Sequence, residues 1–393
     1  MKKANLLALI ALTTLASCGG QSSSDTSQQA SSGEEVSSVS ATEIEDANGR
    51  KVEIRAGTYS KIVCIGAGAL RMYSYVGDAS LLAGVEDIDN LEAEGRPAMF
   101  DGVARPYFIA NSESYKGLPS CGKGGPMAQA AEAEKILNCR PDLVISEYED
   151  VEKADALQKQ LGVPVITLKY GGKGVFDAAC KKSISLIAEV IGTSAKAETL
   201  LSYIDAAEKD LAKRTEGLAS DKQAYICGLG NWGTTNHLMT AKNYEPFNIA
   251  HITNIADTLL ANNGIQKIEE ETLVGAYKDI DVMFLDAAAV KNIKPLYAEN
   301  PNMFDGCKAV EDGEVYLQMA YNAYYTNLEI NLANTYFCAK TYYPDAFADV
   351  DMKEKLDEIT NAFLGKKLAD DIYSYPQSFG GYQKIDVKEF FGA

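Results

Sequence analysis

Two sets of strand-like segments, separated by a long stretch without a strand signal, constrain the fold of this chain most. Short apolar runs alternate with helical patterns, which is typical of α/β folds with largely parallel sheets. The first set of predicted strands covers 61–65, 81–85, 143–146 and 165–168, and the second covers 224–227 and 282–285. Predicted helices follow strands of the first set at 69–76, 130–137 and 151–161. We therefore expect two α/β units.

The stretch between the two sets is predicted to hold two helices. One covers 176–191 and ends at Gly192, and the next begins at Ser194 and carries Leu200, Ile204 and other apolar residues at helical spacing. Roughly twenty helical residues span about 30 Å, the width of a small domain. The expected fold is therefore two Rossmann-like α/β lobes joined by one long helix, with a ligand cleft between the lobes.

The predicted boundaries follow from this pattern. The N-terminal lobe covers 42–175, the linking helices 176–215 and the C-terminal lobe 216–393. About 350 residues exceed what one hydrophobic core usually serves, which also favours two lobes.

The first 17 residues are predicted to be an export signal. Lys2 and Lys3 provide the positive start, residues 6–12 a short apolar core, and Leu15-Ala16-Ser17-Cys18 the processing site. The last four residues resemble a bacterial lipobox, and this resemblance implies that Cys18 carries the lipid of a membrane anchor. The alternative is an ordinary secretory signal with a chance cysteine. Residues 18–41 are rich in Ser and Gln and are predicted to form a disordered tether.

Charge and cysteine usage exclude several classes of protein. The net charge of −18 argues against nucleic acid or an anionic lipid surface as a partner, although a local basic cluster would still admit an anionic ligand. No apolar run after the signal is long enough to span a membrane. Of the eight cysteines, seven remain once Cys18 is acylated, and none forms a C-x-x-C pair. Zinc-finger and redox-motif functions are therefore not expected, and no cofactor or resident metal is predicted.

Several motifs resemble the helical-backbone (class III) binding proteins of ABC importers, which take up iron-siderophores, cobalamin, haem and related chelates. The matching segments are 45–52, 61–66, 82–85 and above all 134–145, Glu-Lys-Ile-Leu-Asn-Cys-Arg-Pro-Asp-Leu-Val-Ile. The resemblance implies a lipid-anchored, extracytoplasmic protein that hands a small molecule to an ABC permease and its ATPase. It also implies that Glu134 and Glu271 (or the adjacent Glu270) dock on the permease, although both glutamates also fit solvated helix faces.

Two places in the N-terminal lobe are candidates for contact with the solute. Gly66 and Gly68 follow a strand and open a helix, so their backbone N–H groups favour a negative group. Arg71 lies in the first turn of this helix, where a cation is disfavoured unless an anion is near. Arg105 and Tyr107 belong to a second candidate, a rigid loop set by a proline. The alternative for Arg71 is an ion pair within the protein.

In the C-terminal lobe the candidates are Trp232, His237, Tyr324 and Tyr325. Trp232 is flanked by glycines and suits stacking on a ligand, unless it covers a lobe edge. His237 is either a solute contact or a hydrogen-bonded loop residue, because no second ligand lies at metal-binding spacing. Tyr324 and Tyr325 offer an apolar face and a hydroxyl donor, and we expect them on a turn or a helix start.

The predicted function is the capture of an anionic iron(III) chelate by a monomeric protein. Molybdate, tungstate and cobalamin are the alternative cargoes, and haem is disfavoured because few axial ligands are present. An enzyme is not expected, since the chain has no nucleophile elbow, His-Glu-x-x-His motif or Walker loop. A ligand-sensing surface lipoprotein and a secreted glycosidase remain the alternatives without a transport role.

Overall fold

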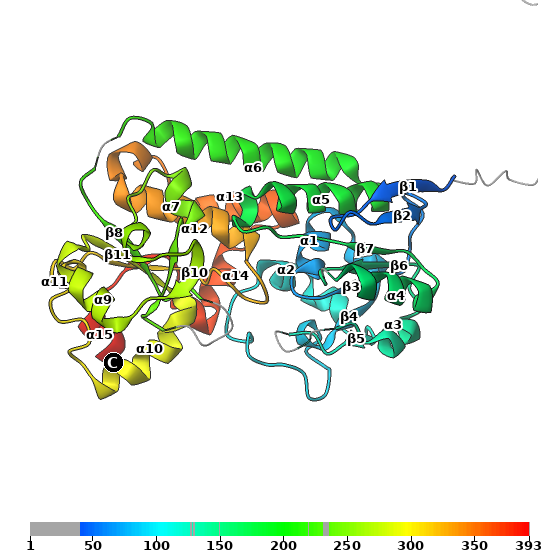
Figure 1. Ribbon diagram of the computed structural model, residues 1–393, viewed down its shortest axis with the longest axis horizontal. Coiled ribbons are helices and arrows are strands. Elements are labelled where there is room, and N and C mark those ends of the chain that lie inside the picture. Colours follow the sequence, from blue (N-terminus) through cyan, green and yellow to red (C-terminus); the bar gives the residue numbers. More distant parts are fainter. Residues whose placement is uncertain are drawn as a thin grey trace, which may run out of the picture. The chain divides into compact units, whose positions relative to one another are not determined.

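The two sets of strands form two separate main sheets in a computed structural model of the protein (Figure 1). The structure describes residues 40–125, 128, 130–148, 150–218, 220–230 and 236–392. All of these belong to one compact unit. The predicted signal peptide, Cys18 and all but the last two residues of the predicted tether lie outside the described residues.

The sheet of the N-terminal lobe has five parallel strands in the order β5-β4-β3-β6-β7. These are β3 (Ile62–Ile65), β4 (Leu82–Glu86), β5 (Ser120–Gly122), β6 (Leu143–Ser146) and β7 (Val165–Thr167). The connecting helices are α1 (Ala69–Val76), α2 (Pro106–Tyr115), α3 (Ala133–Cys139) and α4 (Val151–Leu161). An antiparallel pair, β1 (Thr42–Glu45) and β2 (Lys51–Ile54), precedes the sheet. All residues of β3 and β6 are buried, as in parallel sheets covered on both faces.

The sheet of the C-terminal lobe has four strands in the order β13-β12-β11-β8. The first three in the chain are parallel, namely β8 (Ala224–Cys227), β11 (Val282–Asp286) and β12 (Val315–Gln318), and β13 (Gln383–Lys384) is antiparallel. A separate antiparallel pair consists of β9 (Met239–Lys242) and β10 (Gly264–Lys267). The surrounding helices are α7 (Glu245–Ile249), α8 (Ala256–Leu259), α9 (Glu270–Ala276), α10 (Val290–Glu299), α11 (Lys308–Glu311) and α15 (Val387–Gly392).

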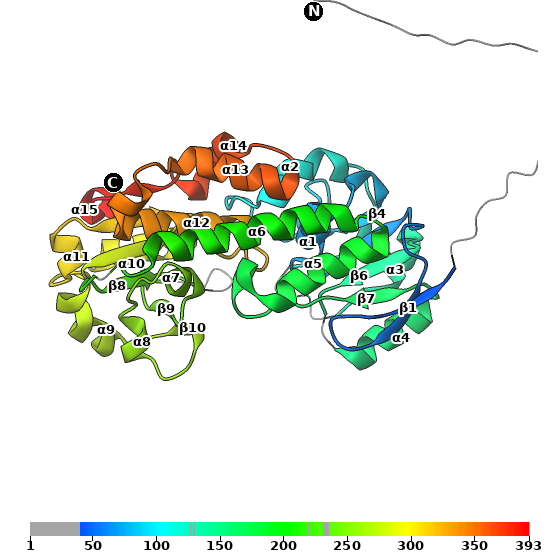
Figure 2. The same cartoon turned by 90° about the horizontal axis from the view of Figure 1, so that it is seen from above.

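Helices connect the two lobes through a common core. α5 (Ala178–Ile191) and α6 (Ser194–Thr215) follow β7, and α6 runs alongside both lobes in Figures 1 and 2. α12 (Leu328–Tyr342), α13 (Met352–Leu364) and α14 (Ala369–Ser374) complete the connection. One continuous cluster of buried apolar side chains contains Ile62 of the first sheet and Phe284 of the second. The two lobes are therefore packed on shared helices rather than joined by a free linker.

The predicted two-lobed α/β fold with one long connecting helix is confirmed. The predicted lobe boundaries stay a prediction, because the described residues form one unit. One local prediction is wrong. The segment from Arg105, expected to be a loop, opens α2 with Pro106 at its first turn, where a missing N–H is harmless.

Candidate functional site

A loop of the C-terminal lobe contacts the N-terminal lobe. We call residues 319–327, between β12 and α12, the tyrosine loop. Tyr324 and Tyr325 in this loop have φ of 55° and 71°, in the left-handed region that glycine favours. Such a conformation costs on the order of 1 kcal/mol or more for another residue, and it persists where the surroundings hold it in place. The contacts of this loop therefore identify the residues that hold its backbone in this conformation.

Arg71 of α1 holds the tyrosine loop through its guanidinium group. Nη1 donates to the backbone oxygens of Tyr324 (3.0 Å) and Thr326 (2.9 Å). Nη2 donates to the backbone oxygen of Ala323 (2.6 Å) and to Oδ1 of Asn327 (2.8 Å). The side chain has no exposed surface. The prediction that Arg71 contacts the solute is therefore not supported, because both terminal nitrogens of its guanidinium group donate to oxygens of the protein.

Glu86, at the end of β4, joins the tyrosine loop to the turn after β3. The hydroxyl of Tyr324 donates to Oε2 of Glu86 (2.6 Å), and the backbone N–H of Gly66 donates to Oε1 (3.0 Å). Burial raises the pKa of Glu86 to about 7. The turn at Gly66 was predicted to favour an anion from the solute. The acceptor that it meets is a carboxyl group of the protein.

Gly68, the second glycine of this turn, lies against the ring of Tyr170. Its φ is 90°, and the hydroxyl of Tyr170 donates to its backbone oxygen (3.1 Å). A Cβ added at Gly68 would come within 2.2 Å of the Tyr170 hydroxyl oxygen, so only glycine allows this approach. The beginning of α1 is thus covered by a tyrosine rather than left open for a solute.

Arg105 is also a structural residue. It is 2% exposed and pairs with Asp89 at 2.5 Å between Nη1 and Oδ1, while the Tyr107 hydroxyl donates to the same Oδ1 (2.8 Å). The guanidinium carbon lies 4.6 Å from the ring centre of Phe108. The predicted solute contacts of Arg105 and Tyr107 are therefore not supported. The physical reason is the same as for Arg71, because a buried arginine needs acceptors and the protein supplies them.

A cavity of ≈ 400 Å³ lies between segments of the two lobes. Six aromatic residues line it: Phe100, Tyr170, Tyr244, Tyr321, Tyr324 and Tyr325. The first two come from the N-terminal lobe, and the others follow β9 or belong to the tyrosine loop. The rings of Tyr170 and Tyr325 meet across the lobes with their centres 4.2 Å apart. Cavities of this size that are rich in aromatic residues are typical of small-molecule sites.

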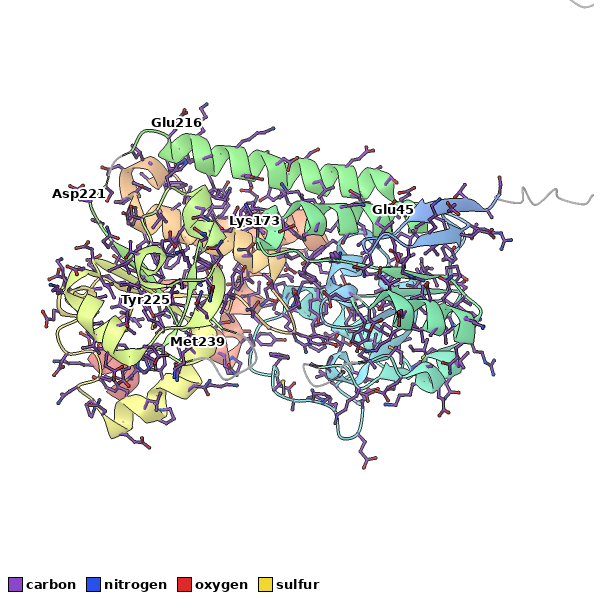
Figure 3. All side chains as sticks on the ribbon, in the orientation of Figure 1. Glu45, Lys173, Glu216, Asp221, Tyr225 and Met239 are labelled. Carbon is purple, nitrogen blue, oxygen red and sulfur yellow. The ribbon has the colours of Figure 1, made fainter. Side chains whose placement is uncertain are left out.

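Polar groups in the cavity wall are mostly uncharged. They include the amides of Asn243 and Asn322 and the hydroxyl of Thr326. Glu245, the first residue of α7, is the one charged side chain among the described lining residues. Its Oε1 lies 3.4 Å from Nζ of Lys173, which is labelled in Figure 3 and extends from the segment after β7.

The sequence prediction identified Tyr324 and Tyr325 but missed most of this wall. Both tyrosines line the cavity, and Tyr325 is 40% exposed, so its contact with a solute stays a prediction. Tyr170 directly precedes the glycine-rich segment 171–174, which follows a parallel strand. Ligand sites are common at such positions, so this pattern could have identified Tyr170 from the sequence. Tyr244 and Glu245 follow β9, a strand that the periodicity did not reveal.

The other predicted site residues lie apart from the cavity wall or outside the described residues. Trp232 falls in 231–235, which the structure does not describe. His237 is 7% exposed and packs edge-on against Phe304, and burial lowers its pKa. Glu134 and Glu271 are exposed in the first turns of α3 and α9, where they are open to a partner.

Within the described residues, no group of three or more His, Cys, Asp or Glu side chains is arranged to hold a metal ion. None of the helices in the described part of the chain has the length and apolar character to cross a bilayer.

Solved structures with a similar fold are solute-binding proteins. A periplasmic solute binding protein of Veillonella parvula matches with a TM-score of 0.64 and 18% identity, over 86% of this chain and 96% of that chain. The molybdate-bound MolA of Haemophilus influenzae matches with 0.62 and 17%, over 83% and 98%. The Helicobacter pylori protein CeuE, in a complex with nickel and histidine, matches with 0.57 and 16%, over 83% and 96%. At such identities the likeness concerns the fold alone.

The match to a protein family is independent of these structures. No curated protein matches the chain. The family described as "Periplasmic binding protein" matches residues 102–318, which include β5, β6 and β7 of the first sheet, both linking helices and most of the second sheet. This family consists of extracytoplasmic proteins that bind a small molecule for an ABC transporter. The matched segment is more than half of the chain, and the chain therefore belongs to the periplasmic binding protein family.

Proposed function

We propose that the protein is the lipid-anchored solute-binding component of an ABC importer, and that its solute is an iron(III) chelate of the siderophore kind. The observation that carries this proposal is the aromatic cavity between the lobes. Its volume of ≈ 400 Å³ suits an organic chelate, and its rings offer flat faces with hydroxyl groups at their tips.

A thermal-shift screen of the full chain tests the cargo, because a ligand that binds the folded state raises the melting temperature. The panel contains iron(III) trihydroxamate and tris-catecholate complexes, the corresponding iron-free chelators, cobalamin, molybdate and tungstate. We expect a shift with at least one iron complex and a smaller one with its iron-free form. A shift with an oxyanion and none with the chelates would overturn the proposed cargo while leaving the fold unaffected.

Molybdate is the second candidate, because MolA, one of the similar structures, is bound to it. The described wall of the cavity offers less to an oxyanion than to an organic ligand. Oxyanions are best held by arginine, lysine or converging N–H groups. The two arginines near this region, Arg71 and Arg105, are buried with protein acceptors.

Docking on the permease is proposed for Glu134 and Glu271, which are exposed on one helix of each lobe. Exchange of either residue for lysine is expected to stop transport of the bound solute while leaving solute affinity unchanged. Transport at the normal rate in both variants would contradict this role.

The proposed monomer and the proposed lipid anchor need separate tests. Gel filtration with light scattering measures the oligomeric state of the protein. Labelling with a palmitate analogue checks the anchor, since Cys18→Ala is expected to abolish incorporation of the label.

A further inference from the structure

The charge of the cavity wall differs from the one that an anionic solute requires. Of the sixteen described lining residues, none is Lys, Arg or His, and Glu245 is the one that carries a formal charge. The side chain of Glu245 is 12% exposed, so most of its carboxylate is shielded from water. An anion entering this space would meet a carboxylate without a lining cation to offset it.

The groups behind the wall do not reverse this picture. Glu86 accepts from the hydroxyl of Tyr324, and Asp286 accepts from the backbone N–H of Tyr321 (2.9 Å), so two carboxyl groups are hydrogen-bonded to lining residues. Arg71 also lies behind the wall, but its donors meet carbonyl and amide oxygens of the tyrosine loop. Glu329 is also buried nearby, where its Oε2 accepts from the hydroxyl of Tyr75 (2.9 Å).

The aromatic rings, like the carboxylate of Glu245, favour a cationic solute. The face of a tyrosine ring carries a partial negative charge that attracts ammonium and other cations. Tyr170 and Tyr325 present such rings at the contact between the lobes, with 46° between their planes, and Tyr325 is partly open to solvent. A positively charged group passing this pair would be drawn inward, whereas an anion would gain nothing from the ring faces.

Glu245 has a partner that a solute can replace. Nζ of Lys173 lies 3.4 Å from Oε1 of Glu245, and the lysine side chain is 62% exposed. Because the lysine is mostly exposed and the contact is long, the ion pair is weak and the lysine leaves at a small cost. Asn248 donates to the other oxygen of Glu245 (3.2 Å) and keeps the carboxylate in place.

The net charge of the whole chain also favours a cationic solute over an anionic one. A net charge of −18 repels anions at a distance and attracts cations, and a protein built to collect anions usually offsets such a field with a basic rim. Lys173 lies beside the cavity wall, and it is paired with Glu245.

We infer that the cavity selects a solute with a cationic group, in particular a metal chelate that carries an ammonium, and that Glu245 is the residue that binds this group in place of Lys173. This inference rests on the proposed function and replaces the anionic chelate that the sequence favours. Glu245 also lies at the first position of α7, where an acidic residue stabilises any helix. The test therefore needs a readout that a helix-stabilising role would not move.

The test compares two iron(III) complexes that differ in one charge. One is a linear trihydroxamate complex with a free terminal ammonium, and the other is the same complex with its amine acetylated. An iron(III) tris-catecholate complex, which is strongly negative, is the third probe. Affinities are measured by titration calorimetry on the full chain, on Glu245→Gln and on Glu299→Gln. The last variant removes the same charge from an exposed position at the end of α10, so it controls for the change in net charge.

We expect the wild-type chain to bind the cationic complex about fivefold more tightly than the acetylated one, and the catecholate most weakly. In Glu245→Gln the cationic and acetylated complexes should bind within about twofold of each other, whereas Glu299→Gln should keep the wild-type ratio. Tightest binding of the catecholate, or an unchanged ratio in Glu245→Gln, overturns the inference alone. Failure of all three complexes to bind overturns the proposed function and this inference together.

Discussion

The two sides of the tyrosine loop show opposite uses of polar side chains. Behind the loop, Arg71 and Glu86 are buried and bonded to the protein. In front of it, the cavity is lined by rings, amides and the single carboxylate of Glu245 among its described residues. The charged residues that look most suited to a ligand thus hold the wall in place, and the proposed recognition of the solute falls to the residues that line the cavity.

The largest effect is expected from breaking the buried side. Arg71→Ala leaves three carbonyl groups of the tyrosine loop without their donor, and we expect a loss of about 3–5 kcal/mol in the free energy of unfolding. Denaturant titration measures it. The matched control is Arg55→Ala, since Arg55 is exposed and should change stability by less than about 0.5 kcal/mol. Equal, small losses in both variants would show that Arg71 does not support the loop.

A second effect concerns pH. Burial raises the pKa of Glu86 and of Asp286 to about 7, from ordinary values of 4.5 and 3.8. Both groups therefore hold a proton more tightly in the folded than in the unfolded chain. Their contribution to stability is complete below about pH 4, declines as the pH rises and is lost above about pH 7.

Glu86→Gln should remove one of these two contributions. Between pH 4.5 and pH 7 its stability is expected to fall by about 2 kcal/mol less than that of the wild type. Melting curves across this range measure the difference, with Glu299→Gln as the control that keeps the wild-type slope. A wild-type slope in Glu86→Gln would mean that Glu86 titrates like an exposed carboxyl group.

On the side of the tyrosine loop that faces the cavity, Tyr325→Ala should weaken solute binding more than it lowers stability. Tyr325 is 40% exposed and meets Tyr170 at the cavity, so its removal is expected to weaken solute binding about tenfold while stability changes by less than about 1 kcal/mol. Tyr325→Phe keeps the ring and should bind within about threefold of the wild type. An unchanged affinity in the alanine variant would exclude Tyr325 from the solute contact.

The smallest effect is expected at Lys173. Lys173→Ala removes an exposed ion pair and should change stability by less than about 0.5 kcal/mol. Because it frees Glu245, affinity for the ammonium-bearing complex should rise about twofold, and that for the acetylated complex should not. Weaker binding of the cationic complex would instead indicate that Lys173 contacts the solute itself.

The fold was largely predictable because its strands and outer helices carry clear patterns. The predicted strands at 143–146 and 224–227 and the predicted helices at 69–76 and 151–161 coincide with β6, β8, α1 and α4. α12 escaped prediction because thirteen of its fifteen residues are buried, including Glu329, Asn331 and Asn334. A helix that is buried all round has no apolar stripe to detect.

The site was less predictable because its partners are distant in the sequence. Arg71 and the carbonyl of Tyr324 are 253 residues apart, so no local pattern reveals that the arginine has acceptors within the protein. The same holds for Glu86 and Tyr324, which are 238 residues apart. A charged residue beside a glycine-rich turn resembles a ligand contact until the fold supplies its partner.

The continuous core beneath α6 has a consequence for how a transporter would tell a loaded protein from an empty one. Side chains of both sheets pack into one cluster, so opening the lobes would expose apolar surface along the shared helices. If Glu134 and Glu271 dock on the permease as proposed, the distance between them would then change little when a solute is captured. A transporter would then detect a captured solute at the rim of the cavity, where Tyr325 and Lys173 are exposed.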